Sequence, residues 1–468
     1  MGKDIQHALI SIIQQALKEL KLNALHKEPI YIDLPANAKF GDLSTNIALV
    51  LSKAARKPPV EIARSLADHI NRQLERSSVR RHIAQVKVEG AGFLNFYFSE
   101  EYLYGQLKAI VVKKEKQLKV NYGRSMPVLL EFVSANPTGP LSVAHARQAA
   151  VGDVLANILD FLGFKVKREY YLNDEGNQIN ILGESVRLRR EELNGGKTEF
   201  PENHYQGEYI FDIAREAGDR IKSEDLGEFS ANYILEIIKK ELDDFGINFD
   251  YWYSQKSLRE SGKINKALDF LKKKGYLYEQ DGATWFKSTQ FQDDKDRVVI
   301  KSDGSYTYLA PDIAYHLEKY KRGFKRLINL WGPDHHGYIN RLRAAVMALG
   351  YPRDSLSVVI VQLASIYKEG KLLEMSTRKG QYITLREVLD EVGRDTSRFF
   401  FLMRRTSSHL DFDLDIAKKQ TPENPVYYVQ YAYARIASIL RTSPIKPGRN
   451  ADLELLKEKE ELGLIKKL

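Results

Sequence analysis

The chain has 468 residues, of which 43% are hydrophobic and 28% are charged, a composition ordinary for a globular protein of roughly two to four domains. It contains no cysteine, which excludes disulfides, thiolate catalysis and thiolate zinc sites. No apolar run is long enough to span a membrane, and the N-terminus lacks the apolar core of a signal peptide, so we expect a cytoplasmic protein with no membrane partner. The net charge of +9 suits a partner rich in phosphate.

Residues 1–112 mix helices and strands, which predicts an α+β N-terminal domain. An amphipathic helix is expected near the start, with these apolar positions on one face: Ile5, Leu9, Ile12, Ile13, Leu17 and Leu20. A second helix is expected at 63–75, and strands at 84–88 and 93–98. The alternation of side chains along the second strand predicts that Phe93 lies in the core.

From residue 120 to residue 394 the pattern changes to strand, helix, strand, which predicts an α/β domain around a parallel sheet. Strands at 128–133 and 166–172 flank a helix that ends at Gly163. Residues from about 185 to 295 are polar and rich in lysine and glutamate, which predicts a mostly helical insertion. Further apolar strands are expected at three places: 298–300, 326–331 and 357–363.

Residues 395–468 become helical again. The stretch 424–440 places one set of apolar side chains on a common face: Val426, Val429, Tyr433, Ile436 and Ile439. The last segment still shows helical periodicity at Leu462, Ile465 and Leu468, and an apolar face needs a partner. We therefore expect either that the chain is truncated inside a helical domain or that this face docks elsewhere.

The stretch EFVSANPTGPLSVAHARQ (131–148) turns from an apolar strand into a helix whose start carries His145. In parallel-sheet folds such a turn is where nucleotides bind, and the helix N-terminus attracts phosphate. Gly139, Ser142 and Ala144 are small enough for a ligand to approach the backbone, and His145 can hydrogen-bond a phosphate oxygen as charge develops at the α-phosphorus. The competing interpretation is a capped helix with a surface histidine.

The stretch LLEMSTRKGQYITL (372–385) is a basic loop between a strand and a helix. Arg378 and Lys379 can clamp the β- and γ-phosphates of ATP, although alone this would be an ordinary charged loop. The adjacent His335 and His336 point apart, and no further ligand follows at metal-binding spacing, so we expect no metal held by the protein.

Together the two stretches resemble the HIGH and KMSKS motifs of class I aminoacyl-tRNA synthetases. Longer stretches resemble arginyl-tRNA synthetases in particular: ANPTGPL (135–141), REYYLNDEGNQI (168–179), GSYTYLAPDIAYH (304–316), WGPDHHGYINR (331–341) and DTSRFFFLMRRTSSHLDFDLD (395–415). FGDLSTNIAL (40–49) and GAGFLNFYF (90–98) resemble the N-terminal domain of that family. QGEYI (206–210) also resembles the family, without a chemistry that its residue types assign.

The resemblance implies a Rossmann-like class I catalytic domain over 120–394. It also implies an N-terminal domain that binds the tRNA D-arm over 1–112 and the beginning of an α-helical bundle that binds the anticodon over 395–468. The implied reaction ligates L-arginine to tRNA-Arg through arginyl-adenylate. The implied cofactor is ATP with Mg²⁺, without zinc, and the implied state is a monomer.

The resemblance also implies roles for individual residues. The implied catalytic residues are His145, Ser142, Arg378 and Lys379. The implied ATP-binding residues are Ala135, Asn136, Pro137, Thr138, Gly139, Pro140, Leu141, Ser142, Val143, Ala144, His145, Met375 and Ser376. The implied arginine-binding residues are Glu131, Asn136, Tyr308, Asp312, Asp334 and His335. The implied tRNA-binding residues are Asn95, Phe98, Tyr427 and Tyr431.

The chain departs from the family pattern in both motifs. Ser142 and Ala144 replace the first histidine and the glycine of HIGH, and Glu374 and Thr377 replace both lysines of the KMSK pattern. These departures slightly favour an alternative, a non-catalytic RNA-binding paralogue of the synthetases. The retained arginine pocket argues against this alternative. A synthetase for another amino acid would leave two carboxylates misplaced, unless its substrate is also cationic.

Overall fold

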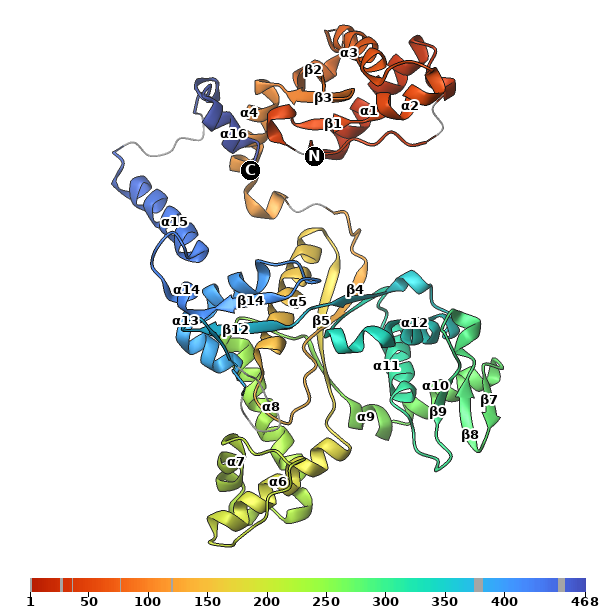
Figure 1. Ribbon diagram of the computed structural model, residues 1–468, viewed down its shortest axis with the longest axis vertical. Coiled ribbons are helices and arrows are strands. Elements are labelled where there is room, and N and C mark those ends of the chain that lie inside the picture. Colours follow the sequence, from red (N-terminus) through yellow and green to blue (C-terminus); the bar gives the residue numbers. More distant parts are fainter. Residues whose placement is uncertain are drawn as a thin grey trace. The chain divides into compact units, whose positions relative to one another are not determined.

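The computed structural model describes residues 2–25, 28–35, 37–75, 77–118, 121–373, 382–444 and 451–468. The contacts between residues divide the chain into two units (Figure 1). The first unit comprises Met1–Leu118 together with Ser443–Leu468, and the second comprises Lys119–Thr442. Within the described ranges, no helix is both long enough and apolar enough to cross a membrane.

The first unit is an α+β structure built on a three-stranded antiparallel sheet of order β1-β3-β2. Its strands are β1 (Leu43–Thr45), β2 (Ile83–Glu89) and β3 (Phe93–Phe98). Its helices are α1 (Gly2–Glu19), α2 (Ile47–Ala55), α3 (Pro59–Glu75), α4 (Glu100–Leu118) and α16 (Lys459–Ile465). The apolar face predicted for the first helix is buried, as Leu9 and Ile13 show, because it packs into the core of this unit.

The second unit contains a five-stranded sheet, all of whose pairings are parallel, in the order β11-β10-β4-β5-β6. Its strands are β4 (Pro127–Glu131), β5 (Lys165–Leu172), β6 (Tyr251–Ser254), β10 (Arg326–Trp331) and β11 (Leu356–Ile360). The predicted α/β class with a parallel sheet is therefore confirmed. Strand β4 lies at the centre, where Val128, Leu129 and Leu130 are buried, as expected of a strand covered on both faces.

Helices on and beside this sheet position the loops at its carboxyl edge. They are α5 (Val143–Phe161), α6 (Asn177–Leu193), α7 (Tyr209–Ala217), α8 (Leu226–Asp244), α9 (Gln255–Glu260), α10 (Lys263–Lys273), α11 (Leu309–Lys321) and α12 (Ile339–Ala348). Helices α6, α7 and α8 form one helical group, as Figure 1 shows. Helix α5 carries alanines and Gly152 on its buried face, and a Cβ at Gly152 would lie 2.3 Å from the Phe132 ring, so this helix packs unusually close to the sheet.

The segment 185–295 was predicted to be one mostly helical insertion. The structure differs from this prediction, because the segment also contains strands. Strand β6 lies inside this range and completes the central sheet. The strands β7 (Leu277–Gln280), β8 (Ala283–Phe286) and β9 (Arg297–Ile300) form a separate antiparallel sheet, which also takes the strand predicted at 298–300. The prediction missed β6 because its Tyr251, Trp252 and Tyr253 are only partly buried and make no aliphatic run.

A third sheet of the second unit has the order β13-β12-β14, with β12 (Ala364–Lys368), β13 (Lys371–Leu372) and β14 (Leu410–Asp413). The helices α13 (Leu385–Leu402), α14 (Leu414–Lys418) and α15 (Pro425–Thr442) accompany it. The boundary predicted between residues 394 and 395 falls inside α13, one residue after the non-helical Gly393. Because β14 pairs in parallel with β12, the chain just after this boundary remains part of the second unit.

The two apolar faces predicted near the C-terminus differ in burial. On α15 only Val426 is buried, whereas Val429, Tyr433, Ile436 and Ile439 are exposed. On α16 the side chain of Ile465 is buried, and this helix packs against α4 of the same unit. This packing agrees with one of the two expectations for the last segment, namely that its apolar face docks onto another element.

Candidate functional site

A cavity of about 620 Å³ lies where β4, β5 and β6 end. Its walls come from the turns that follow these strands and from α6, α7 and the start of α11. The predicted residues that line it are Ala135, Asn136, Thr138, Gly139, Pro140, Ser142, His145 and Tyr308. The carboxyl edge of a parallel sheet is where folds of this class bind nucleotides, so this cavity is the candidate ATP site.

The chain enters this cavity through a strained turn. Val133 and Ser134 have φ values of 69° and 41°, in the left-handed region that non-glycine residues rarely adopt. Two hydrogen bonds hold the turn: the Tyr170 hydroxyl donates to the Ala135 carbonyl at 2.9 Å, and the Tyr171 amide donates to the Ser134 Oγ at 3.1 Å. The sharp bend directs the following ANPTGP segment along the cavity wall.

Ser142 and His145 cap the N-terminus of α5. The Ser142 backbone N–H donates to the Nδ1 atom of His145 at 3.2 Å, and the Ser142 Oγ lies 3.1 Å from the same nitrogen. Burial lowers the pKa of His145 to about 4, so the ring is neutral near neutral pH. Because Nδ1 accepts a hydrogen bond, the single proton of the neutral ring lies on Nε2, and His145 presents an N–H donor.

The end of the basic loop 372–385 contacts the capped start of α5 directly. The predicted Met375, Ser376, Arg378 and Lys379 lie outside the described residues. Just beyond them, the Leu385 N–H donates to the Leu141 carbonyl at 2.7 Å, and the Val143 N–H donates to the Ile383 carbonyl at 3.2 Å. The two motifs are therefore joined by backbone pairing at one end of the loop.

A second cavity of about 650 Å³ shares Tyr308 with the first. It contains the predicted Asp312 and His335, and it is also lined by Tyr338. The Tyr338 hydroxyl donates to Asp312 Oδ2 at 2.6 Å. Burial is the main cause that raises the pKa of Asp312 to about 6; the nearby Glu131 carboxylate adds to this rise, and the hydrogen bond from Tyr338 opposes it.

Two predicted arginine-binding residues line neither cavity. Glu131 is buried, and its carboxylate forms an ion pair with the fully buried Lys319, which also donates to Asn329 Oδ1 at 3.3 Å. Asp334 is exposed, and its Oδ2 lies 3.3 Å from His335 Nε2. The structure therefore gathers Asn136 and Tyr308 in one cavity and Tyr308, Asp312 and His335 in the other.

Sequence reasoning missed several residues of the first cavity. Asn173, Glu175 and Gln178 line it, and the Asn136 Nδ2 donates to Gln178 Oε1 at 2.6 Å. These residues directly follow β5, so their place at the end of a predicted parallel strand was the available signal. Tyr209 of the QGEYI stretch and Tyr382 also line the cavity, and residue type alone gave no signal for them.

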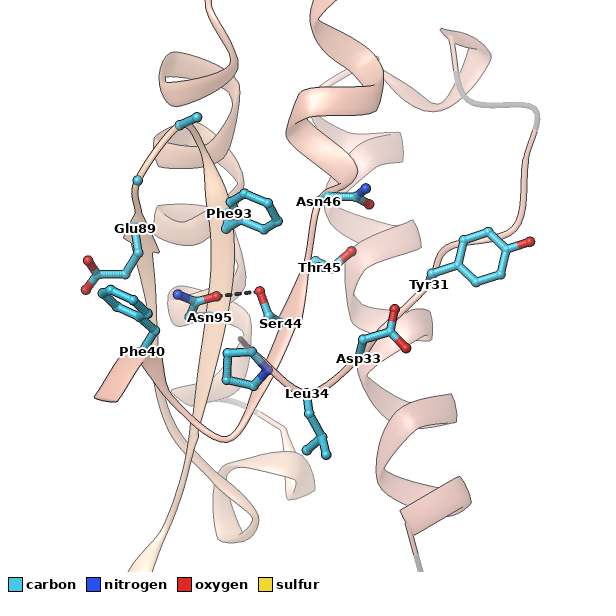
Figure 2. Close-up of a pocket in the computed structure, with 13 residues that line it drawn as sticks. Tyr31, Asp33, Leu34, Phe40, Ser44, Thr45, Asn46, Glu89, Phe93 and Asn95 are labelled. Atoms are coloured by element: carbon cyan, nitrogen blue, oxygen red, sulfur yellow. Dashed lines mark hydrogen bonds between the residues drawn. The ribbon is translucent and has the colours of Figure 1, made fainter. Parts of the chain in front are cut away.

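A groove of about 540 Å³ lies on the sheet of the first unit (Figure 2). The predicted Asn95 lies in it on β3, and its Oδ1 accepts a hydrogen bond from the Ser44 hydroxyl of β1 at 2.5 Å. The buried Thr45 hydroxyl also belongs to this groove and has no hydrogen-bond partner among the described residues. The groove thus combines apolar walls with a few polar groups, as ligand sites do.

The prediction that Phe93 lies in the core is wrong. Its side chain is 41% exposed and lines the groove together with Phe40. Side chains at positions 93 and 95 share one face of β3, whereas Phe96 and the predicted Phe98 share the other. Phe98 packs against Tyr102, with ring centroids 4.8 Å apart, so the structure does not bring it together with Asn95.

The predicted tyrosines of α15 lie beside each other. The rings of Tyr427 and Tyr431 are stacked, with centroids 6.1 Å apart and planes 18° apart. Tyr431 is exposed and Tyr427 is half-buried. Flat exposed aromatic rings of this kind can stack on unpaired bases.

Comparison with known proteins gives consistent matches along the chain. Residues 106–402 match the family described as "tRNA synthetases class I (R), catalytic domain", and residues 7–98 match "Arginyl tRNA synthetase N terminal domain". Similar curated proteins include the arginine–tRNA ligase of Geobacillus kaustophilus, which is 48% identical over 97% of this chain and 84% of its own length. The arginine–tRNA ligase of Bacillus subtilis is 46% identical over 93% of this chain and 80% of its own.

The fold also matches a solved structure, the Thermus thermophilus arginyl-tRNA synthetase, with a TM-score of 0.72. That match covers 98% of this chain and 85% of the other, and its 23% identity bears on the fold alone. The sequence relatives carry the assignment, because they are more than 40% identical to this chain over nearly its whole length. The chain belongs to the arginyl-tRNA synthetase family.

Proposed function

We propose that the chain ligates L-arginine to tRNA-Arg in two steps, with ATP as its Mg²⁺ complex. In the first step, a carboxylate oxygen of arginine attacks the α-phosphorus of ATP. The bond from that phosphorus to pyrophosphate breaks, and arginyl-adenylate forms. In the second step, a hydroxyl of the terminal tRNA ribose attacks the carbonyl carbon of the arginyl group, and AMP leaves. The family and the cavity beside the first motif, which Tyr382 also lines, support this proposal.

The single observation that carries the proposal is the neutral His145 at the start of α5. Its Nε2–H and the positive end of the α5 helix dipole form a positive pole beside the first cavity. Negative charge grows on the α-phosphate oxygens during the displacement, and fixed donors stabilise that charge without reorganising. Ser142 supports the same pole, and Arg378 with Lys379 would stabilise the leaving pyrophosphate.

For the amino acid, we assign the guanidinium to Asp312 and the α-amino end to Asn136. Asp312 is a partly buried carboxylate whose described side-chain hydrogen-bond partner is the neutral Tyr338 hydroxyl, so it can still pair with a cation. Glu131 is already paired with Lys319, and its role is to hold this network in shape. His335 and Tyr308 would complete the wall around the side chain.

For the tRNA, we assign the groove of the first unit to an unpaired base of the D-arm. Phe93 and Phe40 offer aromatic faces, and the Asn95 amide offers hydrogen bonds. Tyr431 and its neighbour Tyr427 would stack on bases near the anticodon.

Arginine-dependent exchange of labelled pyrophosphate into ATP tests the proposal, measured with and without tRNA-Arg. We expect exchange that requires arginine, is not supported by lysine, and depends on the tRNA. His145→Ala should lower the exchange rate by roughly 10²- to 10³-fold, as the loss of one oxyanion donor does. His336→Ala is the matched control, because His336 is exposed and lines neither cavity. Absence of arginine-dependent exchange in the folded wild-type protein would contradict the proposed function.

A further inference from the structure

Two tyrosine hydroxyls hold the turn that leads into α5. Tyr209, the first residue of α7, donates to the Thr138 carbonyl at 2.8 Å, and Tyr382 donates to the Pro140 carbonyl at 3.0 Å. We propose that Tyr209 and Tyr382 are positioning residues, which fix the turn at Gly139 so that the helix start meets the phosphates of ATP. This inference rests on the proposed function and gives a role to the QGEYI stretch.

Both hydroxyls are suited to permanent hydrogen bonding. Burial raises the pKa of Tyr209 and that of Tyr382 far above the usual value, so both phenols stay protonated and act as donors. Both side chains line the first cavity beside His145. The two tyrosines come from segments far apart in the chain, and their hydroxyls bind the carbonyls on either side of one residue. We call this pair of hydrogen bonds the tyrosine clamp.

That residue is Gly139, and the clamp explains why it is a glycine. A Cβ placed on Gly139 would lie 3.0 Å from the Tyr209 hydroxyl oxygen and 3.1 Å from the Tyr382 hydroxyl oxygen. Its φ is not in the left-handed region, so the backbone itself does not demand glycine. A methyl group there would make unusually tight contacts, so the two hydroxyls would have to shift to admit it.

Tyr382 also links the turn to the basic loop. Tyr382 lies near the end of the basic loop 372–385 and is the first residue described after Arg378 and Lys379, and the pairing of Ser142 with Thr384 follows two residues later. On the other side, the buried Glu241 of α8 accepts a hydrogen bond from the Leu141 N–H at 3.4 Å. The turn is therefore fixed by α7, by α8 and by the end of the loop that carries Arg378 and Lys379.

The test removes the hydroxyl oxygen of each of the two tyrosines in turn. In the exchange assay, Tyr209→Phe and Tyr382→Phe should each lower kcat by roughly 10-fold, because small displacements of a reacting group are costly. The KM for arginine should stay within about twofold, since Asp312 and its pocket are untouched. Tyr320→Phe is the matched control: it also removes a buried tyrosine hydroxyl of the second unit, which is hydrogen-bonded to Ser355 at 2.6 Å, and Tyr320 lines neither cavity.

A second measurement separates positioning from mere stability. Gly139→Ala should lower kcat in the wild-type background. The factor by which it lowers kcat should be at least threefold smaller when both tyrosines are phenylalanine, because the two hydroxyl oxygens nearest the added Cβ are gone. Equal costs in both backgrounds would overturn the clamp, as would tyrosine variants that melt earlier with unchanged kcat. An inactive wild-type protein would instead refute the proposed function, so the two failures are distinguishable.

Discussion

Burial sets the protonation of the two side chains that matter most in the cavities. His145 is kept neutral, with a pKa of about 4, and offers a donor to phosphate. Asp312 has a pKa of about 6, raised first by burial, and offers a carboxylate to a cation. A free carboxylate in a buried site is unstable until a cation neutralises it, so the same burial that raises this pKa favours a guanidinium ligand.

The raised pKa of Asp312 predicts a pH-dependent affinity for arginine. Below its pKa the free carboxyl is protonated and cannot pair with the guanidinium, so binding weakens as the pH falls. Arginine affinity measured by calorimetry should fall about tenfold between about pH 7 and pH 5. Asp312→Asn should bind weakly at both values, without this pH dependence. An affinity in the wild-type protein that is independent of pH over this range would show that Asp312 does not carry the recognition.

One arginine of helix α5 attaches this helix to two loops of the second unit. Arg147 is fully buried, and its guanidinium donates to four carbonyls: Gln362, Leu363, Arg405 and Ser408, at 2.7 to 3.2 Å. Two loops, one after β11 and one before β14, are thereby attached to the helix that carries His145. Five fixed donors in one plane make arginine suited to this task, and lysine cannot reproduce it.

Arg147→Met should destabilise the protein by about 3 kcal/mol or more, because it removes four hydrogen bonds that a fully buried guanidinium donates. Arg147→Lys should lose less, since an ammonium group can still reach part of this set. Urea unfolding followed by fluorescence measures both variants. Loss of less than about 1 kcal/mol in the methionine variant would mean that water replaces the guanidinium at these carbonyls.

The sequence predicted the elements whose pattern is local. Strand β10 matches its predicted range of 326–331, and α5 matches because an apolar strand, a turn and a helical repeat follow each other directly. The short strand β6 was missed, because its aromatic residues are only partly buried and give no apolar run. Phe93 was assigned to the wrong face, because alternation gives two faces and does not say which one meets the core.

Within the site, first-motif residues predicted from the sequence line the first cavity, whereas pairings between distant residues were not predicted. Glu131 was expected to meet the substrate, yet Lys319, which lies 188 positions later, pairs with it. Likewise Tyr209 and Tyr382 reach the turn only because the fold brings α7 and the end of the loop there. Such pairings are set by tertiary structure, and no spacing in the sequence records them.

At the scale of the whole molecule, the two units carry separate parts of the proposed task. The second unit contains both cavities, and the first contains the groove of Figure 2. The affinity of a nucleic acid that binds both units would depend on contributions from each. The excess of 71 basic over 62 acidic residues favours this partner and makes the binding sensitive to salt.

Phe93→Ala should therefore weaken tRNA binding without changing the chemistry. Removing one stacking partner costs about 1–3 kcal/mol, so the KM for tRNA-Arg in aminoacylation should rise roughly 5- to 150-fold. The kcat at saturating tRNA should be unchanged, because the groove and the cavities belong to different units. Val50→Ala, an exposed apolar residue of α2 outside the groove, is the control. A lower kcat at saturating tRNA would contradict this division.

The hydrogen bond between Tyr382 and Pro140 joins residues 242 positions apart. A ribosome adds about 5–20 residues per second, so on the order of ten to fifty seconds separate the synthesis of the two partners. During that interval the strand β4, its turn and α5 have already emerged, while the Tyr382 wall of the nucleotide cavity does not yet exist. Until Tyr382 has been synthesised, the nascent chain therefore lacks one of the two hydroxyls that hold the turn at Gly139.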